Sequence, residues 1–416
     1  MKVTGMQPNQ IRLSIPEGYL AFLANLPWDH RLEDWNRHKV RFVPVKSGLS
    51  RHIVRFVESN GHSFAIKETT AESALKELAN YHHLKELEIP TLHPVGVVER
   101  DDGTLRVETP IGEQIDQNST AYLITEVMEK VIPDSHLFRR SFTLKSRQRI
   151  WDAVIHLFIS LHSAGVYWGD ASLANMLVRF TTERIPEMGS RTKLAAILAD
   201  AETVEIHPSI SDRMRLSEIE FFLESMLWTE ADLKASGIVR DPMMTREDSD
   251  YILTHYNERF ALGQEMRSFE LVTRIDVDRM LGMVDVKGYG TLLLKHINEH
   301  KWYLSEKGGK EVPLVESAHD WYNEVFKPVC RILTGHGMGT LFPDKTASTL
   351  YVEIMEHKYL MSERQKGDVG LVAALEDYLG KFGKQQLAGI SIPSLVRALT
   401  SFFTRPQPPV QNSYLP

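Results

Sequence analysis

Hydrophobic and polar positions alternate along the early part of the chain, between residues 40 and 70. Three short runs rich in β-branched residues lie there, separated by Ser47-Gly48 and by Asn60-Gly61. An Asn-Gly pair between two such runs is a strong signal for a β-hairpin turn. The pattern therefore predicts an antiparallel meander over residues 40–70.

The period changes to that of a helix at residues 71–87, where apolar side chains fall on one side and Lys and Glu on the other. The apolar positions are Ala74, Leu75, Leu78, Tyr81 and Leu84. Beyond Pro90 and Pro94 the pattern predicts strand segments at 95–98 and 105–107, joined as a hairpin through Asp101-Asp102-Gly103. A compact apolar run predicts a further strand at 121–127.

After Pro133 the chain becomes mainly helical. Apolar residues at helical spacing predict a helix over 149–163 that ends at Ala164-Gly165. Short apolar runs at 176–180 and 194–198 predict two strands, and the pattern beyond about residue 214 is helical throughout. A β-rich first part followed by helices predicts the α+β class.

The helical part contains an internal repeat with an offset of 57 residues (356 − 299). Glu299-His300-Lys301 and Ser305-Glu306 recur as Glu356-His357-Lys358 and Ser362-Glu363, and the match continues through Asp320 and Asp377. Two copies are fewer than a solenoid needs, so they predict one helix–turn–helix unit built twice, with both copies at a shared interface. The polar residues kept in both copies either bind a partner or cap and brace the bundle.

Composition narrows the class of protein. The 416 residues are 43% hydrophobic and 25% charged, which fits two or three ordinary domains. A net charge of −7 lacks the basic excess of a dedicated nucleic-acid-binding protein. The single cysteine, Cys330, excludes a disulfide framework and a cysteine-rich zinc site, and favours a reducing, cytoplasmic location. We expect neither a secretion signal nor a transmembrane segment, because no apolar stretch approaches about 18 residues.

The segment from Leu161 to Val178 contains the main candidate chemistry. A helix ends at Gly165, a polar loop presents Asp170, and Asn175 opens a short strand. Phosphoryl transfer uses such a pair, because a carboxylate orients the attacking hydroxyl while an amide oxygen helps to hold a metal ion. A second acid, Asp200, follows the strand at 194–198, in a position suited to Mg²⁺.

Two further charged residues lie upstream. Lys67 falls on the third strand of the meander and Glu77 on the helix that follows it. A Lys–Glu pair of this kind orients the α- and β-phosphates of a nucleotide. The candidate site is thus spread over both the β-rich and the helical part of the chain.

Taken in order, these residues resemble those of the protein-kinase-like fold over about residues 40–235. They are Lys67, Glu77, Asp170, Asn175 and Asp200. The sequence departs from ordinary protein kinases in several places. Trp168-Gly169 stands before the aspartate where His-Arg is usual, Ser172 replaces the catalytic-loop lysine, and Asp200-Ala201-Glu202 replaces Asp-Phe-Gly. These departures are similar to the atypical branch that includes lipopolysaccharide kinases and aminoglycoside phosphotransferases.

Longer phrases are similar to an uncharacterised bacterial lipopolysaccharide-kinase-like family, which joins this domain to a C-terminal helical domain of unknown function. These phrases begin at Gly48, Trp168, Asp200 and His300. The resemblance implies a bilobal kinase-like domain followed by an all-α domain. The expected regions are an N-terminal segment and N-lobe (1–128), a C-lobe (129–239), a helical domain with the duplication (240–404) and a Pro-rich disordered tail (405–416).

The resemblance also implies ATP and Mg²⁺ as cofactors, with transfer of the γ-phosphate to a hydroxyl of a small molecule, glycan or protein. Lys67 would contact the α- and β-phosphates, Glu77 would hold Lys67, and Asp170 would be the base or orienting group. Asn175 and Asp200 would bind the metal. The backbone N–H groups of Ser47, Gly48, Leu49 and Ser50 would cover the phosphates, and the hinge Glu126–Met128 would line the nucleotide site through Glu126 and Met128.

Several alternatives stay open at this point. A pseudokinase, acting as a nucleotide-gated module whose helical half engages a partner protein, would retain the same fold, and nucleotidyl transfer would use the same residues. Glu202 is either an outer partner of the metal site, acting through a metal ligand, or a cap. His296 and His300 stand four apart on a helix, but packing explains them better than zinc, since no third ligand is evident. A basic group around Arg139-Arg140 is either an anion site or a solvated helix start.

Overall fold

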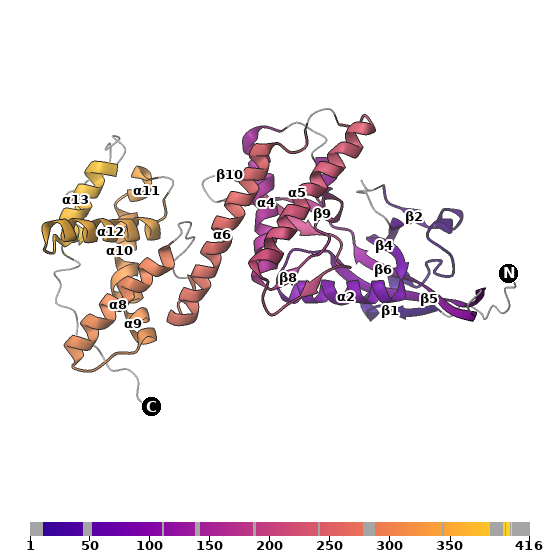
Figure 1. Cartoon of the computed structure of the whole chain (residues 1–416), viewed down its shortest axis with the longest axis horizontal. Coiled ribbons are helices and arrows are strands. Elements are labelled where there is room, and N and C mark those ends of the chain that lie inside the picture. The colour runs from indigo at the N-terminus through magenta and orange to yellow at the C-terminus, as the bar shows by residue number, and fades with distance from the viewer. Residues whose placement is uncertain are drawn as a thin grey trace. The chain divides into compact units, whose positions relative to one another are not determined.

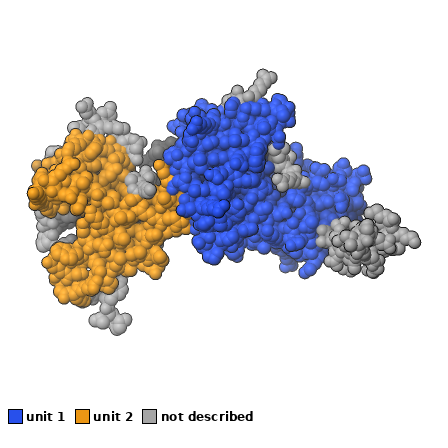
Figure 2. Space-filling view, viewed as in Figure 1, with its two compact units in different colours: residues 1–257 blue, residues 258–416 orange. Residues whose placement is uncertain are grey.

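The computed structural model in Figure 1 describes residues 11–44, 52–109, 112–137, 142–185, 189–239, 242–277, 288–342, 345–382 and a few residues between 394 and 401. The chain divides into two compact units, residues 1–257 and 258–416, which are coloured separately in Figure 2. The division lies within helix α6 (Arg246–Thr273), beyond the expected domain boundary at 239/240. The expected phosphate-covering segment Ser47–Ser50, Arg139-Arg140 and the tail 405–416 lie outside the described residues.

The first unit begins with an antiparallel sheet of strand order β1-β5-β6-β4-β3-β2. Its strands are β1 (Ile11–Ser14), β2 (Arg41–Phe42), β3 (Val54–Ser59), β4 (His62–Thr70), β5 (His93–Thr109) and β6 (Gly112–Glu126). The predicted meander is confirmed. Strands β3 and β4 pair in register and turn at Asn60-Gly61, where both residues have positive φ (50° and 83°), as a tight hairpin turn requires.

The predicted hairpin at Asp101-Asp102-Gly103 is wrong. Strand β5 continues through this tripeptide to Thr109, and its pairing with β6 shifts register between Asp101 and Thr104. Residues that favour turns also tolerate a β-bulge, in which one strand accommodates extra residues without reversing direction. The tripeptide therefore marks an irregularity in the strand, but this irregularity is a bulge and not a turn.

The segment before the meander packs on the sheet, which the sequence pattern did not predict. It contains helix α1 (Glu17–Leu23) and the 3₁₀ helix η1 (Asp34–Arg37). A buried cluster unites it with the sheet and includes Leu23, Trp28, Leu32, Trp35, Phe64 and Tyr122. Strand β1 passes so close to Gly96 that a Cβ there would lie 2.3 Å from the Ser14 carbonyl oxygen. Only glycine permits this approach.

Helix α2 (Ala71–Glu86) follows the meander as predicted, and the Thr70 side chain caps it by accepting a hydrogen bond from the N–H of Ser73. The second lobe begins after β6. Its elements are β7 (Val131–Pro133), α3 (Asp134–Leu137), α4 (Leu144–Ser163), β8 (Val166–Tyr167), η2 (Leu173–Asn175), β9 (Met176–Ile185), β10 (Gly189–Leu198), β11 (Glu205–Ile206) and α5 (Asp212–Ala235). The predicted helix at 149–163 and strands at 176–180 and 194–198 are confirmed.

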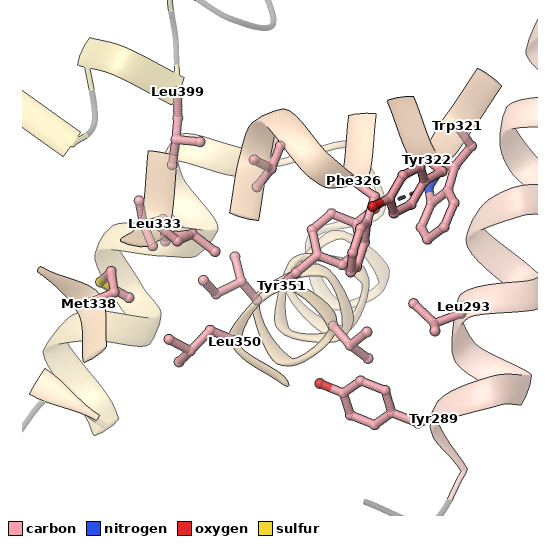
Figure 3. Packing of buried hydrophobic residues seen from close by; sticks show 14 of the residues in the cluster. Tyr289, Leu293, Trp321, Tyr322, Phe326, Leu333, Met338, Leu350, Tyr351 and Leu399 are labelled. Carbon is pink, nitrogen blue, oxygen red and sulfur yellow. Dashed lines mark hydrogen bonds between the residues drawn. The ribbon is translucent and has the colours of Figure 1, made fainter. Parts of the chain in front are cut away.

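The second unit is helical in its described residues. After the last part of α6, its elements are α8 (Tyr289–Gly308), α9 (Leu314–Trp321), the π-helical turn η3 (Tyr322–Phe326), α10 (Lys327–Gly335), α11 (Met338–Leu341), α12 (Ala347–Gln365) and α13 (Gly370–Phe382). Figure 3 shows its core, where Trp321, Phe326 and Tyr351 pack together and the Trp321 indole N–H donates to the Tyr351 hydroxyl (3.3 Å). The predicted α+β chain with a helical C-terminal part is therefore confirmed.

The two sequence copies form equivalent structures, α8 with α9 and α12 with α13. In each copy a histidine bridges the two helices, with Nε2–Oδ2 distances of 2.7 Å for His300–Asp320 and 2.6 Å for His357–Asp377.

The turns of the two copies match as well. The Ser305 Oγ accepts from the N–H of Val312 (3.0 Å), and the Ser362 Oγ from that of Val369 (3.2 Å). The repeated polar residues thus brace each helix pair. The bridge to Asp320 also accounts for His300. In the described chain, neither His296 nor His300 belongs to a group of potential metal ligands.

Candidate functional site

The Lys67 side chain is the centre of the candidate site. Strand β4 presents it, and its Nζ lies 2.8 Å from Glu77 Oε2, 3.0 Å from Asp200 Oδ2 and 3.3 Å from Glu202 Oε2. An ammonium group has three N–H donors, so these carboxylates match its full donor capacity. The fold therefore joins residues separated by more than a hundred positions in the sequence.

Helix α2 is fixed against the segment that contains Asp200. The Tyr81 hydroxyl lies 2.9 Å from Glu77 Oε1 and 2.8 Å from the carbonyl oxygen of Ala199. The preceding residue, Asn80, donates its side-chain amide N–H to the carbonyl oxygen of Ala201 (2.7 Å). These contacts join α2 to the backbone on both sides of Asp200, and they therefore fix the position of Glu77 beside Lys67. Tyr81 appeared in the sequence only as an apolar helix position.

Burial and charge act in opposite directions on this group. Burial disfavours the charged form of Lys67, but the carboxylates of Glu77 and Asp200 raise its pKa above the usual value. Burial, followed by the negative charge of Asp200, raises the pKa of Glu77 to about 7, although Lys67 opposes this shift. Burial also disfavours the charged form of Glu202, yet Lys67 and then His52 lower its pKa below the usual value.

Asp170 and Asn175 form the second part of the site. The Asn175 Nδ2 donates to Asp170 Oδ2 (3.0 Å) and to the Asp170 carbonyl oxygen (3.1 Å). This bonding assigns the amide nitrogen to the Asp170 side and leaves the amide oxygen as an acceptor for another group. The Asp200 Oδ1 accepts the N–H of Glu202 (3.1 Å), which orients that carboxylate.

Hydrogen bonds connect the loop that contains Asp170 to the loop that contains Asp200. The Trp168 indole N–H donates to the carbonyl oxygen of Asp200 (2.8 Å), and the Thr203 hydroxyl donates to that of Trp168 (2.8 Å). Gly169 has a φ of +81°, and a Cβ there would lie 3.0 Å from the Thr203 carbonyl oxygen. Trp168, which in the sequence was only a departure from the kinase pattern, thus joins the two loops.

A cavity of about 510 Å³ gathers most of the expected site residues. Its charged and polar lining includes Lys67, Glu77, Glu126, Asn175 and Asp200, and Met128 also lines it. Apolar side chains complete the walls, among them Val54, Phe56, Ala65, Leu123 and Leu177. An apolar pocket with a few convergent polar groups is typical of small-molecule sites. Asp170 does not line the cavity and is connected to it through Asn175.

Within the described residues, Glu77, Asp200 and Glu202 form the group whose spacing would suit a metal ion, with ligand atoms within 4.8 Å of one another. The Lys67 ammonium contacts all three carboxylates and neutralises part of their charge. In this conformation the group is therefore an ion-pair network around Lys67. Glu202, for which metal binding and capping were both open, is part of that network.

One protein family matches part of the second unit. The family described as "Domain of unknown function (DUF4032)" matches residues 315–382, within the second unit. No curated protein matches the sequence. The matched residues cover helices α9 to α13 of the helical unit.

Three similar solved structures illustrate the range of the resemblance. WaaP, solved in complex with acyl carrier protein, has 17% identity and a TM-score of 0.37, with 63% of this chain and 93% of WaaP covered. An aminoglycoside-3'-phosphotransferase of type VIII has 16% identity and a TM-score of 0.34 (53% and 87% covered). The Rio2 kinase of Chaetomium thermophilum, in an ADP/Mg²⁺-phosphoaspartate complex, has 15% identity and a TM-score of 0.29 (53% and 64%).

No helix in the described part of the chain is both long and apolar enough to cross a bilayer.

Proposed function

We propose that the chain is an ATP- and Mg²⁺-dependent phosphotransferase that transfers the γ-phosphate to a hydroxyl acceptor. The observation that supports this most strongly is the meeting of Lys67, Glu77 and Asp200 at one cavity that Asn175 also lines. Kinases need this combination, because a lysine must contact the phosphates beside a carboxylate and an amide that hold the metal.

The donor set fits the expected metal. Mg²⁺ prefers oxygen ligands, and the Asp200 carboxylate and the Asn175 amide oxygen supply two of them. When bound, Mg²⁺ would neutralise negative charge on the phosphates during transfer. Lys67 would exchange one of its carboxylate partners for the α- and β-phosphates and would keep its contact with Glu77. Glu126, the last residue of β6, and Met128, two residues beyond it, would contact the base.

Asp170 would orient the acceptor hydroxyl and take its proton. The hydroxyl oxygen forms a bond to the γ-phosphorus as the bond from that phosphorus to the β,γ-bridging oxygen breaks, and ADP leaves with the bond's electron pair. The proton passes to Asp170 Oδ and then to solvent. Asn175 supports this step because its Nδ2 donates to Asp170 Oδ2 and fixes the plane of the carboxylate.

Calorimetric titration with ATP tests the binding part of the proposal. We expect heat of binding with Mg²⁺ and a loss of at least about tenfold in affinity for Asp200→Asn, which weakens the metal site by about 1.4 kcal/mol or more. The matched control is Asp232→Asn, an exposed carboxylate on α5, which should bind as the wild type does. Absence of binding by the wild type, or equal affinity in both variants, would contradict the proposal.

The transfer step separates this proposal from its two rivals. A nucleotide-gated pseudokinase would bind ATP without consuming it, and a nucleotidyl transferase would attach the α-phosphate to its acceptor. The acceptor can be sought by comparing phosphorylated lysate components after incubation with the wild type and with Asp170→Asn. A component labelled only by the wild type would define the substrate class.

A further inference from the structure

A buried chain of hydrogen bonds reaches the Asp170 loop from outside the expected kinase-like region. The Glu218 Oε1, on α5, accepts the N–H of Gly169 (2.7 Å). The other oxygen of that carboxylate lies 2.7 Å from His162 Nε2, on α4. The His162 Nδ1 lies 2.6 Å from the hydroxyl of Tyr256, on α6.

These side chains are fully enclosed. Glu218 is 1% exposed, His162 is 3% exposed and Tyr256 is 0% exposed. A buried polar group that loses its partner costs the full free energy of its desolvation, so each bond in this chain constrains the next. The Arg215 guanidinium lies 5.5 Å from the centre of the Tyr256 ring and helps to fix the position of that ring.

The protons of the chain have a definite arrangement. Burial raises the pKa of Tyr256 to about 12, although Arg215 opposes the shift, so the phenol keeps its proton near neutral pH. With the Tyr256 hydroxyl donating to Nδ1, the proton on the other ring nitrogen, Nε2, points to Glu218, which accepts it. The second carboxylate oxygen is then free to accept the Gly169 N–H. Tyr256 thereby selects the tautomer that Glu218 needs.

We infer that Tyr256 is a positioning residue for the Asp170 loop, acting through His162 and Glu218. This inference rests on the proposed function. It assigns a role to α6, whose first half belongs to the first unit, whereas the sequence predicted that the kinase-like region ends at residue 239. The same helix contributes Met266 and Phe269 to the core of the second unit. One continuous element thus contributes both to the loop's support and to the core of the helical unit.

Another tyrosine on α6 provides a matched control. The Tyr251 hydroxyl donates to Asp152 Oδ1 (3.0 Å), so it also connects α6 to α4. Asp152 lies on α4 away from the chain that leads to Gly169. Tyr251→Phe and Tyr256→Phe each remove one hydroxyl and keep the ring, and only the second removes a bond that leads to the loop.

The test uses the full chain and two measurements. Hydrogen–deuterium exchange should show about five- to tenfold faster exchange at the Gly169 amide in Tyr256→Phe and no change there in Tyr251→Phe, as loss of one hydrogen bond predicts. Steady-state ATP turnover should show a similar fall in kcat with an unchanged KM for ATP in Tyr256→Phe alone. A role confined to stability would instead lower the melting temperature and leave both quantities unchanged.

The outcomes distinguish this inference from the proposed function. Equal Gly169 exchange in both variants, or an equal kcat in both, would overturn the positioning role. If the wild type does not turn over ATP, the proposed function fails together with the catalytic meaning of Tyr256. The exchange measurement would in that case still decide whether Tyr256 holds the loop.

Discussion

At the scale of single residues, the site is dominated by the balance of charge around Lys67. Three carboxylates contact one ammonium group, and Glu77 is the most deeply buried of the three, at 1% exposed. Removing a carboxylate from water and placing a second one nearby both favour its protonated form. The raised pKa of Glu77, to about 7, follows from this arrangement and has a measurable consequence for stability.

We predict that Glu77 makes stability fall as the pH rises from about 4.5 to about 7. In this window the folded chain holds a proton on Glu77 that the unfolded chain has released, so the unfolding free energy decreases by up to about 1.4 kcal/mol per pH unit. Urea unfolding of the wild type and of Glu77→Gln at several pH values measures the effect. The variant, which cannot titrate at this position, should lose this part of the slope, and an equal slope in both proteins would refute the prediction.

Gly169 gives a second prediction at this scale. Its left-handed φ of +81° and the nearby Thr203 carbonyl oxygen both oppose a side chain. Gly169→Ala should cost about 1–2 kcal/mol for the backbone conformation alone and should also displace the loop beside Asp170. Gly237→Ala is the control, because Gly237 has a φ of +67° with nothing within 4 Å of a Cβ. Both variants should lose stability, but only Gly169→Ala should lose ATP turnover; turnover that falls equally in both would contradict this.

The candidate site residues that the sequence predicts differ in kind from the residues that support them in the structure. Lys67, Glu77, Asp170, Asn175 and Asp200 have chemically demanding side chains in a fixed order, so their order alone indicated a site. The supporting residues Tyr81, Trp168 and Glu218 act through contacts with segments distant in sequence. No local pattern distinguishes such a residue from an ordinary helix or loop position.

At the scale of elements, helix α6 begins beyond the expected boundary at 239/240, and the first compact unit extends to residue 257. The sequence pattern was helical on both sides of residue 239, so periodicity could not indicate which helices pack together. The structure places Asp248 of α6 in contact with α4, where it accepts hydrogen bonds from the Trp151 indole N–H (2.8 Å) and from Arg147. The first half of α6 is therefore part of the first unit.

Asp248 should be essential for this packing. It is 4% exposed, and its replacement removes the buried carboxylate that Arg147 and Trp151 contact. Asp248→Asn should lower the unfolding free energy by about 3 kcal/mol, in the range for breaking a buried ion pair. The matched control is Asp250→Asn, two residues along the same helix, whose side chain is 70% exposed. Its effect should stay within about 0.5 kcal/mol.

Urea denaturation of both variants measures the difference. A similar loss of stability in Asp248→Asn and Asp250→Asn would mean that α6 does not depend on this buried contact.

The strands at residues 54–70 could be predicted from the sequence, because alternation and the Asn60-Gly61 turn are local signals. The error at Asp101-Asp102-Gly103 arose because a bulge and a turn use the same residue types.

At the scale of the whole molecule, the chain combines a first unit of sheet and helices with a duplicated helical unit. The repeat was visible in sequence because polar residues recurred with the apolar ones, and the structure explains them as matching contacts within each copy. Lys301 pairs with Glu311 (2.8 Å) in the first copy, and Lys358 pairs with Asp368 (3.0 Å) in the second. The packing between helices could not be predicted, since apolar periodicity does not specify partners.

The histidine bridges provide a prediction for this unit. His300→Ala and His357→Ala should each lower the unfolding free energy by about 1–2 kcal/mol, because each variant removes the side-chain bond that joins the two helices of its copy. The double variant should lose the sum, since the two bridges lie in separate copies. His319→Ala, on α9, is the control and should have a smaller effect. Unchanged stability together with loss of a binding partner would instead indicate that the repeated histidines form a binding surface.

The most direct test of the account is the fate of labelled ATP with the purified full chain. Parallel incubations with γ-labelled and α-labelled ATP, each with Mg²⁺ or with EDTA, would be compared for the wild type, Asp170→Asn and Asp200→Asn. We predict Mg²⁺-dependent release or transfer of the γ-label by the wild type, at least about tenfold less in both variants, and no transfer of the α-label. Intact ATP in every incubation, or transfer of the α-label, would contradict the assignment of this site as a phosphotransferase.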